Sequence, residues 1–204
     1  GGAYATEPGV LDLCEAALRV FADLGHEVTP LAPPFPAEAL WQAWTTLRSW
    51  TIAGNLEPLL RTKPDMVKPE LRWEIERGLA LSAADLRRAS TIRSDWFRHT
   101  AGMEVDVLAL PTAQLFAFDA DWHWPRQIAG VAMDSYHRWM EVVVPASLTG
   151  LPALSVPAGF GPSGTPMGLQ LIGHRGGDAA VLNLGREYEA ATDWITRQPA
   201  IPLP

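Results

Sequence analysis

Asp134, Ser135 and His137 are the three residue types of a hydrolase triad, and they stand within four positions of one another. In a triad the hydroxyl, imidazole and carboxylate converge from different elements, whereas neighbouring side chains on one helix point apart. The sequence around the three residues predicts a helix from Asp134 to about Leu148. We therefore expect Asp134 to cap that helix and His137 to pack or to face solvent, and we predict no catalytic residue here.

Gly159, Gly161 and Gly164 have the spacing G-x-G-x-x-G, which in a dinucleotide-binding loop cradles a pyrophosphate. Such a loop follows a strand and leads directly into a helix whose N-terminus faces the phosphates. Here Pro162 has no N–H to offer, and "MGLQLIG" after it predicts a second strand. We expect a β-hairpin whose glycines supply turn conformations, and we predict no cofactor.

The sequence gives only weak support for a metal site. Its five histidines are scattered, and no H-x-x-x-H or C-x-x-C pair occurs. Asp121 and His123 lie two positions apart, which is too little to define a site, so we predict no metal. The single cysteine, Cys14, falls in a predicted helix and cannot form an internal disulfide. We expect a buried thiol in a reducing, cytoplasmic compartment.

The elements that would position these residues alternate between helix and strand. Apolar residues at helical spacing predict helices over residues 7–24, 37–55, 69–78, 82–103, 134–148 and 178–192. Short apolar runs predict strands over residues 26–31, 105–112, 153–156 and 167–172. Ser82 and Asp85 have the spacing of a capping box. The aromatic stretch 113–125 either packs over a core or covers an apolar pocket. The alternation is typical of an α/β fold.

Bulk composition excludes several classes of protein. The 204 residues fit one domain, and 48% of them are hydrophobic. The net charge is −7 and the basic residues do not cluster, so we expect no nucleic-acid partner. No apolar run approaches the roughly 20 residues of a membrane span, so we expect no membrane insertion. Residues 1–10 contain no initiator methionine and no apolar run, which indicates no signal peptide and a chain that begins within a longer protein.

One long pattern identifies the family that the chain resembles. "VPASLTGLPALSVPAGFGPSGTPMGLQLIG", residues 144–173, resembles the C-terminal part of the amidase signature family, and "VDVLALPT" and "DAAVLNLGREYEAAT" resemble its neighbouring strand and closing helix. The likeness covers nearly the whole chain. It implies part of a mixed-sheet α/β fold with helices on both faces. Residues 1–204 would be the C-terminal portion of an amidase domain whose N-terminal part, with the Ser/Gly-rich signature, is absent.

Members of that family hydrolyse a carboxamide to a carboxylate and ammonia or an amine, with a serine nucleophile, a second serine and a lysine base. The lysine must be neutral to accept the serine proton. This sequence has no adjacent serines, and its two lysines lie in a proline-punctuated segment, so the resemblance carries no catalytic residue to the chain. We expect the chain alone to be inactive. The alternatives are a non-catalytic amidase-like binding or interaction protein and a truncated gene product.

The resemblance also implies a substrate-binding side. In glutamine-using subunits of the family, an arginine and an aspartate hold the amino-acid ends of the substrate; here Trp73 and Glu74 fall in the first segment and Met140 in the second. The apolar or aromatic acyl group of a small-molecule amide suits Trp139 and Met140 better. Both side chains could equally be core residues at helical spacing. Exposed strand edges would favour association with the missing N-terminal part or formation of a homo-oligomer.

Overall fold

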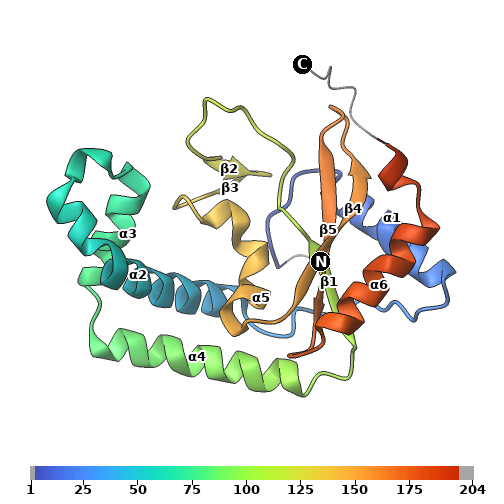
Figure 1. Cartoon of the computed structure of the whole chain (residues 1–204), viewed down its shortest axis with the longest axis horizontal. Coiled ribbons are helices and arrows are strands. Elements are labelled where there is room, and N and C mark those ends of the chain that lie inside the picture. Colours follow the sequence, from blue (N-terminus) through green and yellow to red (C-terminus); the bar gives the residue numbers. More distant parts are fainter. Residues whose placement is uncertain (1–2, 198–204) are drawn as a thin grey trace. The chain divides into compact units, whose positions relative to one another are not determined.

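The structure is a computed structural model that describes residues 3–197. Contacts between these residues divide them into two compact units. The sheet unit comprises residues 3–31, 104–146 and 150–197, and the helical unit comprises residues 32–103 and 147–149. Figure 1 labels the elements of both units. Helices combined with an antiparallel sheet confirm the predicted α/β class.

The sheet unit is built on three antiparallel strands in the order β1-β5-β4. The central strand β5 (Pro166–Gly173) pairs with β1 (Val107–Pro111) on one side and with β4 (Ala153–Phe160) on the other. Helices α1 (Val10–Asp23) and α6 (Asp178–Ala191) pack against β4 and β5 (Figure 1). The shorter elements that lie or begin in this unit are β2 (Gln127–Ile128), β3 (Val131–Ala132), η2 (Arg138–Val143), α5 (Val144–Thr149) and η3 (Trp194–Thr196).

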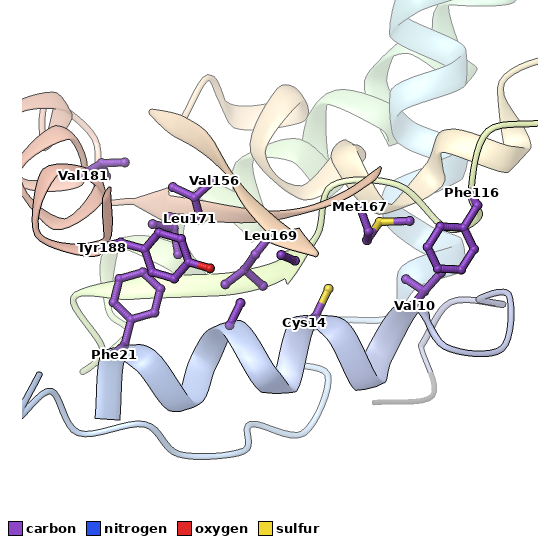
Figure 2. Packing of buried hydrophobic residues seen from close by; sticks show 12 residues of the cluster. Val10, Cys14, Phe21, Phe116, Val156, Met167, Leu169, Leu171, Val181 and Tyr188 are labelled. Atoms are coloured by element: carbon purple, nitrogen blue, oxygen red, sulfur yellow. The ribbon is translucent and has the colours of Figure 1, made fainter. Parts of the chain in front are cut away.

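Helix α1 forms because its apolar residues recur at helical spacing and bury one face. The buried residues are Val10, Cys14, Ala17 and Phe21. The helix ends where the sequence predicts, since Gly25 adopts a left-handed φ of 93° just beyond it. Figure 2 shows this face of α1 against side chains of β4, β5 and α6 in one hydrophobic core. Each large side chain buried there contributes about 1.5–3 kcal/mol.

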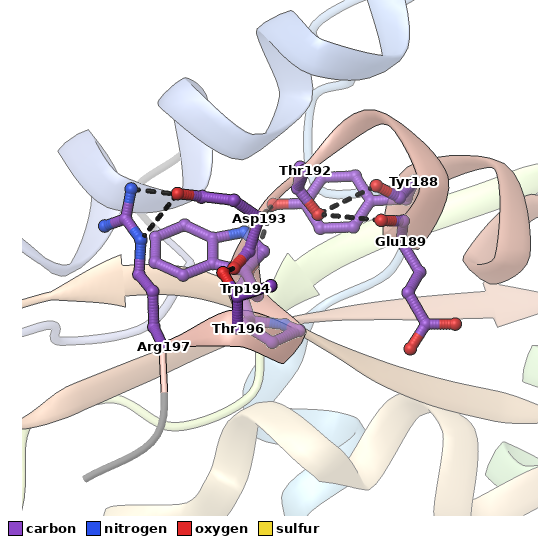
Figure 3. A network of polar contacts seen from close by, with 8 residues as sticks. Tyr188, Glu189, Thr192, Asp193, Trp194, Thr196 and Arg197 are labelled. Carbon is purple, nitrogen blue, oxygen red and sulfur yellow. Dashed lines mark hydrogen bonds and ion pairs between the residues drawn. The ribbon is translucent and has the colours of Figure 1, made fainter. Parts of the chain in front are cut away.

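Tyr188 joins α6 to this core and to the edge of the sheet. Its ring stacks on Phe21 with the ring centroids 4.9 Å apart, and its hydroxyl donates to the Pro157 carbonyl at 2.7 Å. The same hydroxyl accepts from Trp194 Nε1 at 3.3 Å. The Thr192 hydroxyl closes the end of α6 by donating to the Tyr188 carbonyl at 2.9 Å (Figure 3). Burial raises the pKa of Tyr188, so the phenol remains a donor at neutral pH.

The open edge of β1 stops at a proline. The Thr112 N–H donates to a β5 carbonyl at 2.9 Å. Because bonded and non-bonded pairs alternate in an antiparallel ladder, the backbone groups of Val107, Ala109 and Pro111 face away from β5. Pro111 has no N–H, and Gln170 Nε2 donates to its carbonyl at 2.9 Å. The N–H and C=O groups of Val107 and Ala109 therefore remain at the edge.

A proline also interrupts the open edge of β4, which continues to Phe160. The Gly173 N–H donates to the Pro152 carbonyl at 2.9 Å, so Ala153, Ser155 and Pro157 face outward. Pro157 has no N–H, and the α6 phenol caps its carbonyl. The two edges differ in their side chains. Strand β1 is apolar and half-buried up to its last residue, Pro111, which is buried, whereas β4 largely alternates between exposed and buried residues. Continuous apolar strands are typical of sheet interiors, and alternating strands of sheets with one open face.

The glycine-rich segment is the predicted hairpin. Strands β4 and β5 flank a turn in which the Gly161 N–H donates to the Thr165 carbonyl at 2.8 Å. Gly159 and Gly164 have φ values of 138° and 74°, which side-chain-bearing residues rarely adopt. A Cβ atom on Gly161 would lie 2.6 Å from the ring of Phe116. A strand follows these glycines where a dinucleotide-binding loop needs a helix.

The helical unit contains three α-helices and one 3-10 turn: α2 (Ala37–Thr62), η1 (Pro64–Met66), α3 (Pro69–Leu79) and α4 (Ala83–Ala101). The predicted capping box is present at α4. The Asp85 N–H donates to Ser82 Oγ at 3.2 Å, and the Ser82 N–H donates to Asp85 Oδ2 at 2.9 Å. Within residues 3–197, no helix is both long enough and apolar enough to cross a membrane.

Two predicted elements are wrong. Residues 26–31 form no strand; they are exposed and pair with no strand among the described residues, and an extended segment needs such a partner to persist. The continuous helix predicted over 134–148 is also absent. Helical structure starts only at Arg138, departs from helical geometry at Met140 (φ −112°, ψ 21°), and resumes in α5. Pro145 has no N–H to continue a helix from the preceding turn, but it fits the first turn of a new one.

We expect Gly78→Ala to destabilise the helical unit. A Cβ atom there would lie 2.0 Å from the Ser49 carbonyl oxygen of α2, so the α2–α3 contact must open, at a cost of about 1–3 kcal/mol or more. Gly54→Ala is the matched control, because Gly54 is exposed in α2 and has nothing within 4 Å of the added Cβ. It should stabilise by roughly 0.5–1 kcal/mol. Urea unfolding measures both; equal effects would contradict the close contact.

We expect stability to fall as the pH rises from about 9 to about 11. Burial first, and the Glu15 charge second, raise the pKa of the Cys14 thiol from 9.0 to about 11. Between these values the unfolded chain loses the thiol proton while the folded chain retains it, which removes about 2–3 kcal/mol. Cys14→Ala should lack the part of the pH dependence that comes from the thiol and should retain the part that comes from the tyrosines. Urea unfolding of both proteins across this range tests it, and parallel pH profiles would refute it.

Candidate functional site

Trp139 and Met140, the residues predicted to contact substrate, lie where the chain changes from one short helical segment to the next. Segment η2 contains the break at Met140, and α5 follows it. Both side chains are half-buried. Backbone groups beside such a break cannot all be paired within their own segment, so other parts of the chain must supply partners.

Trp139 belongs to an aromatic cluster with the loop that precedes it in the sequence. The edge of its ring meets Phe118, with centroids 5.4 Å apart and planes at 79°. Phe118 in turn stacks on Trp122, which is 56% exposed. Beneath these rings lies a second hydrophobic cluster, which consists of Leu115, Trp124, Ile128 and Met133. The aromatic stretch therefore packs over a core and also presents a large apolar ring to solvent.

The indole N–H of Trp139 is buried and has no hydrogen-bond partner within the described residues. A buried donor without an acceptor costs about 1–3 kcal/mol, and most buried polar groups in proteins are paired. The donor adjoins the exposed aromatic cluster formed by Phe118 and Trp122.

Gln114 holds the segment that carries Trp139 and Met140 from one side. Its side chain is 1% exposed, and its Oε1 accepts from the Val142 N–H at 3.2 Å. Its Nε2 donates to the Ala5 carbonyl at 2.9 Å. One amide thus links η2 to the N-terminal loop, and Val142 itself is fully buried.

Gln170 holds the same residue from the other side. It is 5% exposed in the central strand, and its Nε2 donates to the Val142 carbonyl at 3.1 Å and to the Pro111 carbonyl at 2.9 Å. Sequence reasoning missed both glutamines. The available signal is the single amide within the apolar run "MGLQLIG", because a polar residue in a buried strand must have hydrogen-bond partners.

The same segment contains a buried carboxylate, whose charge acts on the phenol of Tyr4. Glu141 is 6% exposed and pairs with Arg138, whose Nε lies 3.2 Å from its Oε2. Burial, followed by the negative charge of Glu141, raises the pKa of Tyr4 to about 12. Tyr4 is therefore a neutral phenol at physiological pH, and no step in which it serves as a base follows from this geometry.

The triad-like residues do not have the predicted helical setting. Asp134, Ser135 and His137 precede η2, and no side chain caps that segment, so the capping role predicted for Asp134 is wrong. The Ser135 hydroxyl donates to Asp134 Oδ1 at 3.0 Å rather than presenting its proton to an imidazole. His137 is 8% exposed and meets the ring of Tyr136 edge-on. Packing, one of the two roles predicted for His137, is confirmed.

Trp73 and Glu74 lie in the helical unit. Glu74 is buried and pairs with Arg48, with 2.7 Å between Oε1 and the guanidinium Nε. Burial raises the pKa of Glu74, and the charge of Arg48 opposes that rise. Trp73 is 45% exposed, with the Arg77 guanidinium 5.7 Å from its ring centroid. In residues 3–197, no group of three His, Cys, Asp or Glu side chains could hold a metal ion.

The fold combines a three-stranded sheet, two covering helices and a glycine hairpin. Comparison with known sequences identifies the class of protein that has it. A family model for Amidase matches residues 2–182. The chain belongs to the Amidase family, as the pattern over residues 144–173 predicts.

Two curated relatives illustrate the likeness. An acylamidase from Rhodococcus erythropolis is 30% identical over 215 aligned residues, which cover 97% of this chain and 42% of that protein. A glutamyl-tRNA(Gln) amidotransferase subunit from Roseiflexus sp. (strain RS-1) is 34% identical, with 97% of this chain and 44% of that protein covered. The chain therefore spans less than half of the length of these relatives.

Solved structures agree on the fold. A bacterial aryl acylamidase of the amidase signature family matches with a TM-score of 0.82 at 24% identity, over 96% of this chain and 44% of that one. A 6-aminohexanoate cyclic dimer hydrolase matches with a TM-score of 0.79 at 21% identity, over 98% of this chain and 44% of that one. At these identities the likeness establishes the fold.

Proposed function

We propose that this chain is the C-terminal portion of an amidase that hydrolyses a carboxamide to a carboxylate and ammonia or an amine. The observation that carries the proposal is the family match over residues 2–182. The chain supplies the side of the site that receives the acyl group, with Trp139 and Met140 as the contact residues. The cluster of Phe118 and Trp122 extends that apolar surface.

The acyl group proposed for this site is apolar or aromatic. The rings around Trp139 favour such a group through area burial and edge-to-face contact, worth about 0.5–1.5 kcal/mol per aromatic pair. A zwitterionic amino acid would meet no acid at Met140.

The nucleophile and the base come from outside this chain in the proposed enzyme. Ser–Ser–Lys chemistry needs an activated hydroxyl beside a desolvated lysine. The Ser135 hydroxyl of the triad-like segment bonds to a carboxylate. Lys63 and Lys68 are exposed and flank a 3-10 turn. The reacting groups would lie in the portion that the relatives have in addition, since the chain spans 42% of the acylamidase.

The partner proposed for the sheet unit is a strand of that additional portion, added at β1. Val107 and Ala109 offer free backbone groups along a strand that is apolar on both faces. Unpaired edges of this kind attract strands. Without the strand, a second copy of the chain would take its place.

We place the protein in the cytoplasm, because the buried Cys14 thiol suits a reducing compartment. Recovery of the protein from an oxidising, secreted fraction would contradict that placement.

The test of the catalytic proposal is to incubate the purified chain with phenylacetamide and to measure both binding and ammonia release. We expect binding without turnover, and we expect Trp139→Ala to weaken binding because the aromatic contact is lost. Acetamide, which lacks the ring, is the control and should bind more weakly. Turnover by the pure chain would contradict the assignment of the reacting groups to another portion. Absence of phenylacetamide binding would favour a non-catalytic protein or a truncated product.

The test of the edge proposal is light scattering on the chain and on two proline variants. Ala109→Pro removes one outward N–H from β1 and should reduce self-association, because proline blocks strand addition. Ala153→Pro removes the equivalent outward N–H from β4 and is the matched control, which should associate as the unmodified chain does. A monomeric unmodified chain, or equal loss in both variants, would refute the assignment to β1.

A further inference from the structure

We propose that Gln114 and Gln170 are positioning residues of the acyl site. They hold the peptide groups of Val142 from opposite sides, and through them they set the place of Trp139 and Met140. This inference rests on the proposed function of Trp139 and Met140, and it adds the two residues on which the geometry of that site depends.

Both hydrogen-bonding groups of Val142 are held by side chains from distant parts of the chain. Its N–H donates to Gln114 Oε1 at 3.2 Å, and its carbonyl accepts from Gln170 Nε2 at 3.1 Å. Val142 is fully buried, and the glutamines are 1% and 5% exposed, so water does not compete for these bonds. The position of Val142 is therefore fixed relative to β5 and to the segment that follows β1.

Trp139 lies three residues before Val142 in η2, and the break at Met140 falls between them. A break leaves the turn free to shift unless a neighbour holds it, and the two amides supply that restraint. The aromatic ring of Trp139 can contact an acyl group in one geometry only if its place is fixed.

The two glutamines hold Val142 with opposite chemistry, which gives the proposal a sharp test. Gln170 acts only as a donor, to the carbonyls of Val142 and Pro111. Gln114 acts as an acceptor toward Val142 and as a donor toward Ala5. A buried glutamic acid is neutral and offers one acceptor and one donor oxygen, so it can replace Gln114. Methionine has the same length and can make neither bond.

The experiment uses the full chain labelled with nitrogen-15 and compares Gln114→Met, Gln114→Glu and Gln170→Met. The first readout is the indole N–H signal of Trp139, assigned with Trp139→Phe. The second is the dissociation constant for phenylacetamide. We expect both methionine variants to move the signal and to raise the dissociation constant about tenfold or more, because a small displacement is costly at a positioned site. Gln114→Glu should stay close to the unmodified chain in both readouts.

Tyr188→Phe is the control for a purely structural effect. Tyr188 caps the carbonyl of Pro157 at the β4 edge, as Gln170 caps that of Pro111 at the β1 edge, but the bond lies on another strand. The control should lower the urea midpoint and leave the indole signal and the dissociation constant unchanged. If both methionine variants behave like this control, the proposal is overturned.

Two further outcomes are also decisive. If the unmodified chain does not bind phenylacetamide, the proposed function fails, and the indole signal alone judges the positioning role: an unmoved signal in both methionine variants overturns it. If Gln170→Met does not fold, the pair Gln114→Met and Gln114→Glu decides. Equal behaviour of those two variants overturns the proposal, and rescue by glutamate supports it.

Discussion

Buried backbone groups must find hydrogen-bond partners, and prolines in the sheet unit decide where those partners come from. Pro111 ends β1 and Pro157 interrupts the outer edge of β4, and the carbonyls of both prolines are capped, by Gln170 and Tyr188 respectively. Pro145 belongs to the first turn of α5, after the break at Met140. Because the amide of Gln170 serves a carbonyl of β1 and another of η2, the sheet edge and the candidate site share one donor.

Local patterns predicted the elements that depend on local physics. The spacing of apolar residues predicted α1, a capping residue predicted the start of α4, and the glycines predicted the hairpin, because each of these signals acts within a few residues. The misplaced elements depend on distant partners: residues 26–31 have the alternation of a strand, but residues 3–197 offer them no strand to pair with. For the same reason the sequence indicated Trp139 and Met140 as contacts but not Gln114, whose bond to Val142 spans 28 positions.

Family membership and local geometry answer different questions about this chain. The match over residues 2–182 establishes the family, and the likeness to an aryl acylamidase at 24% identity establishes the fold. Neither identifies the acyl group. The proposal for an apolar group rests on the aromatic contacts of Trp139.

The contact between Gly161 and Phe116 joins the hairpin tip to the start of the aromatic stretch, with no room for a Cβ atom between them. The two positions therefore share one volume. A chain of this fold with a side chain at position 161 needs a smaller residue at position 116. Conversely, a chain with a smaller residue at position 116 has room for a side chain at position 161. The glycine thus ties the hairpin to the loop that leads to the candidate site, and sequence change in one is constrained by the other.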